Sequence, residues 1–307
     1  MTGLRPVKVL VIAGCGRSGS TLLTTVLGQI DGFLSIGELT RLWDLIPENR
    51  RPCSCARPLS ECPFWGPVLG SDLTDPRIVQ EAAAAGRRLL QVPLLRRRWI
   101  RAGDRQAFEE AADRYATIFG EVYRRVRSSA GCEVIVDNSK RPVHAYAVGR
   151  SRDCETWVLH LVRDSRAVAL STERHEGRGM ASSARYWMAV NLKAEYFRRA
   201  GQGGARYMRV RYEDFVAEPR ATVERILRFL GEGRALDLFA DDRTVSVGRS
   251  NHHVGAYPDR FPTGPLNILP DNKWSTAMSR RDRLSVMALT WPLLLRYGYP
   301  TASLRAW

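Results

Sequence analysis

The hydrophobic positions of this 307-residue chain form short continuous runs that alternate with longer stretches of helical spacing. The first run, Val-Lys-Val-Leu-Val-Ile-Ala at residues 7–13, is typical of a strand buried on both faces of a parallel sheet. Similar runs predict further strands at 133–136, 156–162 and 206–210. Helical spacing predicts helices at 21–30, 106–127, 183–199, 221–230 and 280–296.

Strands that alternate with helices predict an α/β fold, a three-layer parallel sheet with helices on both faces. Pro219 in the first turn and Gly231 just past the end give the fourth predicted helix its boundaries. Two irregular stretches interrupt the pattern, at residues 47–105 and 248–274. We expect a single domain over residues 1–307, in which the first stretch is a cap-like insertion and the second a lid-like loop.

A glycine-rich turn joins the first strand to the first helix, in the sequence Gly14-Cys-Gly-Arg-Ser-Gly-Ser-Thr21. It has the spacing of the phosphate loop G-x-x-x-x-G-K-[ST], but Ser20 stands in the lysine position. Backbone N–H groups and the helix dipole still form a phosphate cradle. A triphosphate with magnesium is disfavoured without the lysine. The alternative is a tight turn that binds no ligand.

The run Gly-x-x-Arg-Ser-Gly-Ser-Thr-Leu-Leu at residues 14–23 resembles the 5′-phosphosulfate-binding loop of sulfotransferases that use 3′-phosphoadenosine 5′-phosphosulfate (PAPS). The resemblance extends at intervals to about residue 300 and is strongest to the tyrosylprotein and carbohydrate sulfotransferases and many bacterial enzymes. It implies a P-loop-kinase-like fold that lacks the nucleotide-hydrolysing lysine. It also implies that the 5′-phosphosulfate is bound by Gly16, Arg17, Ser18, Gly19, Ser20 and Thr21.

A second motif, Arg163-Asp-Ser-Arg-Ala-Val-Ala-Leu-Ser171, follows the third predicted strand and is similar to the family's 3′-phosphate motif. Arg163 offers paired donors to a phosphate, and Ser171 lies eight residues further on. Asp164 or Ser165 can cap the helix that follows. Arg174, one helical turn after Ser171, is close enough to add a contact, although a solvated side chain is expected. The alternative for Arg163 is a surface ion pair with Asp164.

The later part of the resemblance concerns the nucleotide. Tyr212 lies in the segment Tyr-Glu-Asp-Phe, whose tyrosine approaches the nucleotide in the family; the alternative is a packed ring. Residues 250–274 resemble the family's late loop, which closes over the adenosine diphosphate moiety. In this loop Arg260 and Lys273 match best, and His252 and His253 are expected to line it.

Sulfuryl transfer requires in-line positioning, positive charge on the moving group and a base for the acceptor hydroxyl. Lys140 follows a strand in Asp-Asn-Ser-Lys-Arg-Pro, where the family has a lysine that stabilises the transfer. Gly-Glu-Leu-Thr-Arg at 37–41 resembles the segment that supplies the general base in tyrosylprotein sulfotransferases, so we assign Glu38 as the base. The alternatives are His144 as the base, an exposed turn position for Lys140, and a helix N-terminal carboxylate for Glu38.

The chain carries 47 basic and 32 acidic residues, for a net charge of +15, and only four of the basic residues are lysine. This charge indicates an anionic partner. No face interleaves aromatic and basic residues, so nucleic acid is not expected. The basic and apolar stretch 89–105 admits contact with an anionic membrane surface. Since neither a transmembrane span nor a cleavable signal is visible, a cytoplasmic enzyme is expected.

Six cysteines in 307 residues do not form a disulfide scaffold. Cys53, Cys55 and Cys62 lie within ten residues and can begin a zinc site, but such a site needs a fourth ligand. No histidine or cysteine nearby in the sequence supplies one. We favour a structural turn, with a disulfide only under oxidising conditions, and assign no metal ligand.

Together these motifs predict a sulfotransferase that moves a sulfuryl group from PAPS to a hydroxyl group, without a metal ion. The acceptor is expected to be a small molecule, a lipid or a glycan. These three classes stay open because acceptor pockets are built from variable segments, and no sequence rule identifies a substrate from them. The alternatives are a P-loop kinase-like phosphotransferase and a nucleotide-binding protein without catalysis.

Overall fold

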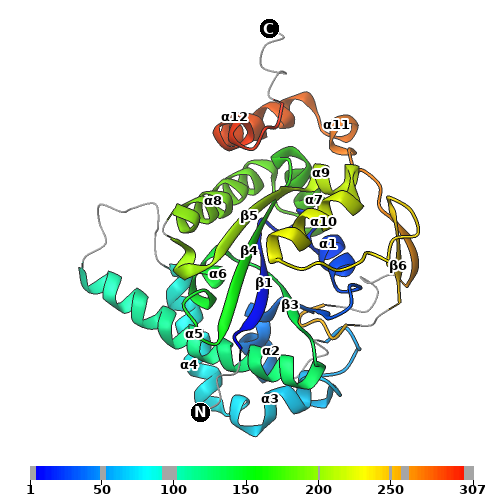
Figure 1. The fold of residues 1–307 in the computed structure, drawn as a ribbon. Coiled ribbons are helices and arrows are strands. Elements are labelled where there is room, and N and C mark those ends of the chain that lie inside the picture. The colour runs from blue at the N-terminus through cyan, green and yellow to red at the C-terminus, as the bar shows by residue number, and fades with distance from the viewer. Residues whose placement is uncertain are drawn as a thin grey trace.

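The central sheet has five parallel strands, in the order β2-β3-β1-β4-β5 (Figure 1). The structure is a computed structural model and describes residues 5–48, 53–91, 102–199, 201–248, 251–256 and 263–300. The four strands predicted from hydrophobic runs are confirmed, and β2 is an additional edge strand. The strands are β1 (Val7–Gly14), β2 (Phe33–Gly37), β3 (Val134–Lys140), β4 (Cys154–Val162) and β5 (Arg206–Arg211).

Both faces of the sheet are buried. Successive side chains of β1 point to opposite sides, so this strand contributes to the core on each face. Val9 and Val11 join one core cluster, whereas Leu10 and Ile12 join a second cluster on the other face. The first face is covered by α2 (Leu42–Glu48), α3 (Trp65–Leu73), α4 (Pro76–Gln91), α5 (Ala102–Ala130) and α6 (Pro142–Val148). The second is covered by α1 (Ser20–Leu27), α9 (Tyr212–Ala217) and α10 (Pro219–Leu230). The predicted three-layer architecture is confirmed.

Three further helices pack on one another beside β4 and β5: α7 (Ser165–Glu176), α8 (Met180–Arg199) and α12 (Arg280–Arg296). Trp187 of α8 and Leu294 of α12 are completely buried between them. In Figure 1, α12 lies at the top, outside α8. The described helices include none that is long and apolar enough to cross a membrane.

The ends of these helices follow local sequence signals. Pro219 occupies the first turn of α10, and Gly231 ends the helix in the left-handed conformation, with φ 71°, as predicted. The Asp164 side chain caps α7 by accepting a hydrogen bond of 2.8 Å from the Arg166 N–H. This cap fixes the start of α7 directly after Arg163, at the carboxyl end of β4.

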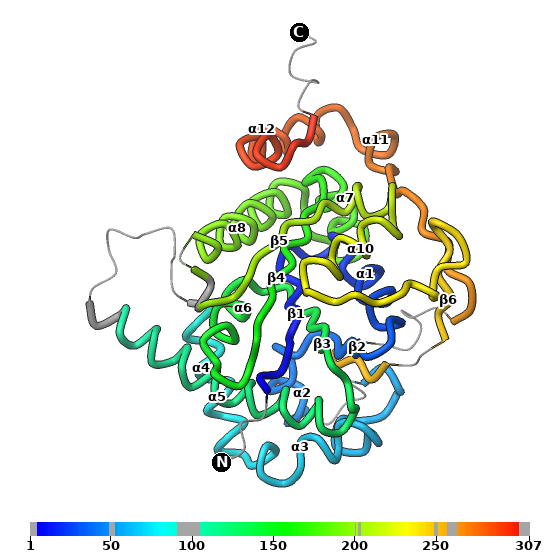
Figure 2. Tube along the Cα trace, viewed as in Figure 1, coloured from blue at the N-terminus to red at the C-terminus, as the bar shows by residue number. Residues whose placement is uncertain are grey.

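The two irregular stretches meet at the edge of the sheet. The first continues from Cys53 through the 3₁₀ turn η2 (Leu59–Glu61) into α3 and α4. The second includes the hairpin strand β7 (Gly264–Asn267), which pairs with β6 (Thr244–Val247), and the short helix α11 (Trp274–Ala277). Between them, Val254 forms a parallel bridge with Gly37 of β2 and an antiparallel bridge with Cys53. Figure 2 shows this late segment, in yellow to orange, running beside β2.

Candidate active site

The turn between β1 and α1 is tight at both of its ends. Gly14 has φ 139°, and a Cβ there would lie 2.3 Å from the carbonyl oxygen of Leu161 in β4. Gly19 has φ 84°, and a Cβ there would lie 2.3 Å from the Tyr212 ring. Arg17, between them, is also left-handed, with φ 64°. Only glycine fits the two outer positions, so the sequence dictates a compact loop that opens onto the first turn of α1, whose N–H groups attract anions.

Two buried polar atoms beside this loop have no hydrogen-bond partner among the described residues: Ser18 Oγ and Arg163 Nε. Both side chains are almost completely buried. Because a buried hydroxyl or guanidinium is normally hydrogen-bonded, these atoms fit a site that is completed by an anionic ligand such as a phosphosulfate nucleotide.

Arg163 lies at the centre of a group of residues that the sequence assigns to the nucleotide. Its guanidinium carbon lies 4.3 Å from the centroid of the Tyr212 ring, and Nη1 donates to the Arg17 carbonyl at 3.1 Å. The Arg17 side chain in turn donates from Nε to Ser171 Oγ at 3.1 Å. The structure therefore brings the glycine loop, Arg163, Ser171 and Tyr212 into one connected arrangement.

Asp271 from the late loop also contacts Arg163, with 3.0 Å between Arg163 Nη2 and Asp271 Oδ2. Burial would raise the pKa of Asp271, but Arg163 outweighs it and holds the pKa below its ordinary value. Beside this pair is a cavity of about 100 Å³ lined by Arg163, Ser171, Lys273 and Arg174. Arg174 is exposed, as expected, and its place one turn after Ser171 also puts it at the edge of this cavity.

Glu38 and Lys140 form an ion pair, so the two residues assigned to catalysis are in contact. Glu38 directly follows β2, and Lys140 is the last residue of β3, with a left-handed φ of 63°. Their side chains are 28% and 21% exposed, so both remain accessible. A left-handed non-glycine residue at a strand end is typical of functional sites, where surrounding structure maintains a strained conformation.

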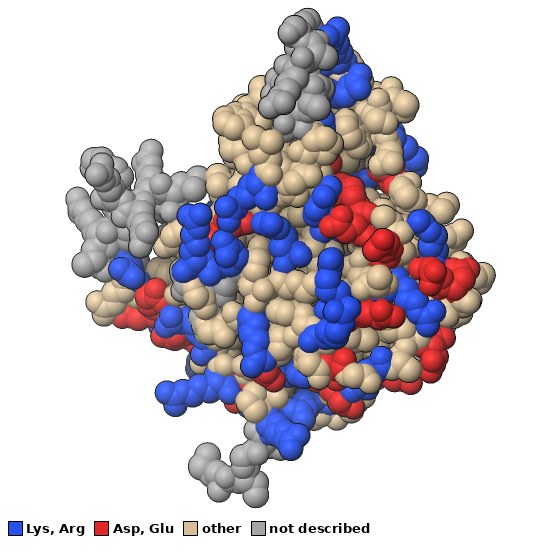
Figure 3. Space-filling view, turned by 45° about the horizontal axis from the view of Figure 1, so that its top comes forward, with Lys and Arg blue, Asp and Glu red and all other residues tan. Residues whose placement is uncertain are grey.

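One large cleft contains the ion pair and the glycine loop. Its volume is about 980 Å³, and Glu38, Lys140, Arg17, Thr21 and Arg163 line it. Gly16, Gly19, Ser20, Ser171 and Lys273 line it as well. Its basic lining residues, Arg17, Lys140, Arg141, Arg163, Lys193 and Lys273, outnumber the acidic ones, Glu38, Glu176 and Asp271. The cleft therefore favours anions. By contrast, basic and acidic side chains are interspersed over the outer face shown in Figure 3.

A family model described as the sulfotransferase family matches residues 10–234. The chain belongs to this family. No curated protein sequence matches the chain. The matched range contains the glycine loop, the ion pair and Arg163, and it ends before the late loop.

Three solved structures that align with nearly the whole length of this chain are described as sulfotransferases or sulfotransferase domains. The sulfotransferase domain from the curacin biosynthetic pathway has a TM-score of 0.56 and 15% identity, covering 97% of this chain and 100% of that one. The domain from the Synechococcus PCC 7002 olefin synthase has a TM-score of 0.47 and 21% identity, covering 98% of each chain. A sulfotransferase from Alicyclobacillus acidocaldarius has values of 0.45 and 15%, covering 99% and 100%. At 15% identity, the likeness to the first of these structures shows the fold alone.

His144, the alternative base, does not line the sulfotransferase cleft. It is 1% exposed and lines a separate cavity of about 60 Å³. Its Nε2 lies 3.0 Å from Asp137 Oδ2, and its Nδ1 lies 2.9 Å from the Tyr115 hydroxyl. Burial would raise the pKa of Asp137, but His144 and hydrogen bonds from Ser139 and Tyr123 hold it below its ordinary value. His144 thus belongs to a buried network that supports the end of β3.

That network reaches the ion pair through the backbone. Asp137 Oδ1 accepts a hydrogen bond of 2.7 Å from the Ser139 N–H, and Ser139 Oγ accepts one of 3.1 Å from the Thr40 N–H. Ser139 precedes Lys140, and Thr40 lies two residues after Glu38. The buried carboxylate therefore fixes both segments that carry the pair.

The predictions for Arg260 and for the two histidines of the late loop have different outcomes. Arg260 lies outside the described residues, as do Arg96, Arg97, Arg98, Trp99 and Arg101 of the basic stretch 89–105. His252 and His253 do not line the cleft: His252 faces the cysteine cluster, and His253 Nε2 lies 3.0 Å from Ser35 Oγ inside the protein. The backbone pairing of Val254 with β2 turns both histidines away from the nucleotide loop.

Proposed function

We propose that this sulfotransferase transfers a sulfuryl group from PAPS to a hydroxyl group of a small-molecule, lipid or carbohydrate acceptor. The observation that carries the proposal is the Glu38–Lys140 ion pair in the same cleft as the glycine loop and Arg163. A base and a cation in contact, next to two anion-binding groups, are the parts that an in-line transfer requires.

Two groups of residues bind the donor in this proposal. The loop from Gly16 to Thr21 and the first turn of α1 hold the 5′ end, where Ser18 Oγ has no hydrogen-bond partner in the described part of the chain. Arg163, Ser171, Arg174 and Lys273 hold the 3′-phosphate, which is supported by the cavity that they line. PAPS supplies an activated sulfuryl group on its 5′-phosphate. Since the loop lacks the P-loop lysine, its hydrogen bonds come from backbone, Ser18 and Arg17.

The two residues of the ion pair have separate roles in the transfer. Glu38 takes the proton of the acceptor hydroxyl as the new bond from oxygen to sulfur forms. Lys140 stabilises the negative charge that remains on the 5′-phosphate oxygen as the old bond breaks. The proton ends on Glu38 and the electron pair on the 5′-phosphate, so the step is balanced. We assign no part of it to a metal ion, because Lys140 supplies the positive charge.

The remaining lining supports an acceptor that has an apolar part next to its hydroxyl. Leu89, Leu90, Val143, Tyr186 and Val190 all border the cleft. Leu90 is 40% exposed and Tyr186 46%, although both are large apolar side chains. Such exposure is common where a ligand covers the surface on binding.

The decisive experiment uses donor labelled in its sulfuryl group. The protein is incubated with labelled PAPS and fractionated cell extract, with and without EDTA. We expect a labelled product in both samples, none with Lys140→Met, and no phosphate transfer from labelled ATP with magnesium. Tight binding of 3′-phosphoadenosine 5′-phosphate without any labelled product would instead support the non-catalytic alternative. Phosphate transfer that EDTA abolishes would support the kinase-like one.

A further inference from the structure

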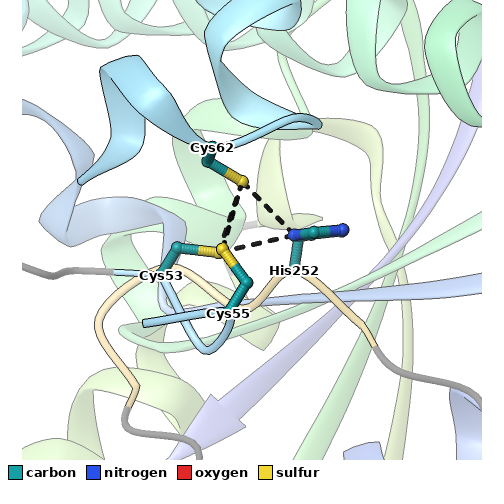
Figure 4. Close-up of side chains that lie close together, drawn as sticks. All are labelled: Cys53, Cys55, Cys62 and His252. Carbon is teal, nitrogen blue, oxygen red and sulfur yellow. Dashed lines mark hydrogen bonds between the residues drawn. The ribbon is translucent and has the colours of Figure 1, made fainter. Parts of the chain in front are cut away.

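Four side chains from segments far apart in the sequence converge outside the cleft. Figure 4 shows Cys53, Cys55, Cys62 and His252 pointing toward one another. The cysteines flank η2, and the histidine comes from the late loop. Their four ligand atoms all lie within 4.8 Å of one another. The expectation that no histidine reaches these thiols is therefore wrong, because the fold supplies one from about 190 residues away.

Four of the six distances between these atoms are close to the edges of a tetrahedron around a zinc ion. Zn–S bonds of about 2.3 Å and Zn–N bonds of about 2.0 Å give S···S edges of about 3.8 Å and S···N edges of about 3.5 Å. The Sγ atom of Cys62 lies 3.5 Å from that of Cys53 and 3.7 Å from that of Cys55. His252 Nδ1 lies 3.6 Å from Cys53 Sγ and 3.3 Å from Cys62 Sγ. These four distances are close to the tetrahedral edges, and the remaining two are no longer than 4.8 Å.

We propose that Cys53, Cys55, Cys62 and His252 bind one Zn²⁺ ion through three thiolates and Nδ1. The three thiols lose their protons to solvent when the ion binds. Four protein ligands leave no open position, which is the arrangement of a structural and not a catalytic zinc site. The proposal is independent of the donor and the reaction assigned to the cleft.

The surroundings hold the histidine in place without the metal. Trp65 Nε1 donates to the His252 carbonyl at 2.7 Å, and the Phe64 ring stacks on the imidazole with 5.4 Å between centroids. Ser54 Oγ donates to the Asn251 carbonyl at 2.6 Å. The imidazole is thus oriented by residues that are not ligands, as a preformed site requires.

A disulfide is the competing use of these cysteines, and the structure does not favour it. All six cysteines are unbonded, and the sulfur atoms in this cluster are separated by far more than the disulfide bond length of about 2.05 Å. A disulfide would use two of the three thiols and would leave His252 without a role. A ligand that all four residues share explains the fourfold convergence.

The proposed ion would connect the insertion to the segment that carries the base. Val254, two residues after His252, donates its N–H to the Ile36 carbonyl at 2.8 Å and accepts from the Glu38 N–H at 3.0 Å. Removal of the metal is therefore expected to loosen residues 251–254 and, through them, the end of β2.

The test measures the metal and thiol content of the full chain purified without a histidine tag. We expect one zinc per chain by mass spectrometry of the metal, and a cobalt-substituted protein with the intense visible bands of a tetrahedral thiolate site. His252→Ala and Cys62→Ser should lose zinc, whereas His252→Cys should retain it and shift the cobalt bands. Cys132→Ser, at a buried cysteine outside the cluster, should bind zinc like the wild type.

Chelation of the wild-type protein provides a second measurement if a variant fails to fold. We expect a chelator to lower Tm and expose three additional thiols to a thiol reagent, and zinc to reverse both changes. The proposal is overturned if the reduced protein binds neither zinc nor cobalt. It is also overturned if an intact mass two hydrogens below that of the reduced chain shows that the cluster forms a disulfide under the conditions of purification.

Discussion

Glu38 and Lys140 form an ion pair across the carboxyl ends of β2 and β3, although 102 residues separate them in the sequence. Parallel neighbours bring their carboxyl ends to the same edge of a sheet, so the residues that follow each strand meet there. The segments that carry the two residues are also joined, because the Thr40 N–H donates to Ser139 Oγ and the Ser139 N–H donates to the buried Asp137 carboxylate.

The pair leads to the first prediction, which concerns catalysis. Glu38→Gln should lower sulfuryl transfer about 100- to 10,000-fold, because a glutamine cannot accept the acceptor proton. Lys140→Met should have a loss of similar size, and the double variant should be little worse than the poorer single variant, since both residues act in one step. Turnover of labelled PAPS measures all three. The matched control, Glu224→Gln on the outer surface of α10, should keep wild-type turnover; additive losses in the double variant would contradict the shared step.

The second prediction assigns Arg163 to one phosphate of the nucleotide. Arg163→Ala should weaken binding of 3′-phosphoadenosine 5′-phosphate by about 10- to 100-fold, the loss expected for a charge-assisted hydrogen bond. The affinity for adenosine 5′-phosphate, which has no 3′-phosphate, should change little. Titration calorimetry with both nucleotides separates the two cases. Equal losses for both nucleotides would place Arg163 at the 5′ end or in a structural role.

Most of the site could be predicted because it is encoded locally. A strand, a glycine-rich turn and a helix determine the conformation from Gly14 to Thr21, and polar residues at the ends of later strands must lie at the same edge of the sheet. Lys140, Arg163 and Ser171 were assigned on this basis and on the family resemblance. Lys140 contacts Glu38, and Arg163 and Ser171 contact Arg17 of the loop, while the roles assigned to them stay predictions.

The parts that could not be predicted depend on tertiary contacts. Strand β2 is only five residues long, lies between Gly32 and Glu38, and contains Ser35, so its hydrophobic pattern is weak. His252 reaches the cysteines because Val254 pairs with both Cys53 and Gly37, a relationship with no signal in sequence spacing. The Arg163–Asp271 contact likewise joins residues that are 108 positions apart.

The third prediction tests the close contact between the glycine loop and Tyr212. Gly19→Ala places a Cβ against the Tyr212 ring, at a backbone conformation that alanine adopts at a cost of about 1–2 kcal/mol. Because Tyr212 packs under the Arg163 guanidinium, we expect both a lower Tm and at least a tenfold loss of 3′-phosphoadenosine 5′-phosphate affinity. Gly131→Ala is the control, since φ there is 63° with nothing within 4 Å of the added Cβ. It should lose some stability and keep its affinity; a normal affinity in Gly19→Ala would show that the loop tolerates the shift.

The fourth prediction concerns stability in acid and the buried His160 of β4. Burial lowers the pKa of His160 to about 4, while its Nε2 lies 2.7 Å from Asn191 Oδ1 and its Nδ1 lies 2.6 Å from the Tyr207 hydroxyl. The unfolded chain takes up this proton near the ordinary histidine pKa of about 6.5, whereas the folded chain does not. Above pH 6.5 the imidazole is neutral in both the folded and the unfolded chain, so it does not affect the free energy of unfolding. As the pH falls from about 6.5 to about 4, only the unfolded chain takes up the proton, and the free energy of unfolding decreases.

The size of this effect follows from proton linkage. One histidine that is protonated only in the unfolded chain lowers the free energy of unfolding by about 1.4 kcal/mol for each pH unit. Urea unfolding at several pH values between 4 and 7 should show this slope in the wild type and a shallower one in His160→Gln, which has no group that titrates at this position. The difference between the two slopes isolates His160 from the carboxylates that begin to titrate near pH 4. Identical slopes in the two proteins would mean that His160 is protonated as readily in the folded chain as in the unfolded one.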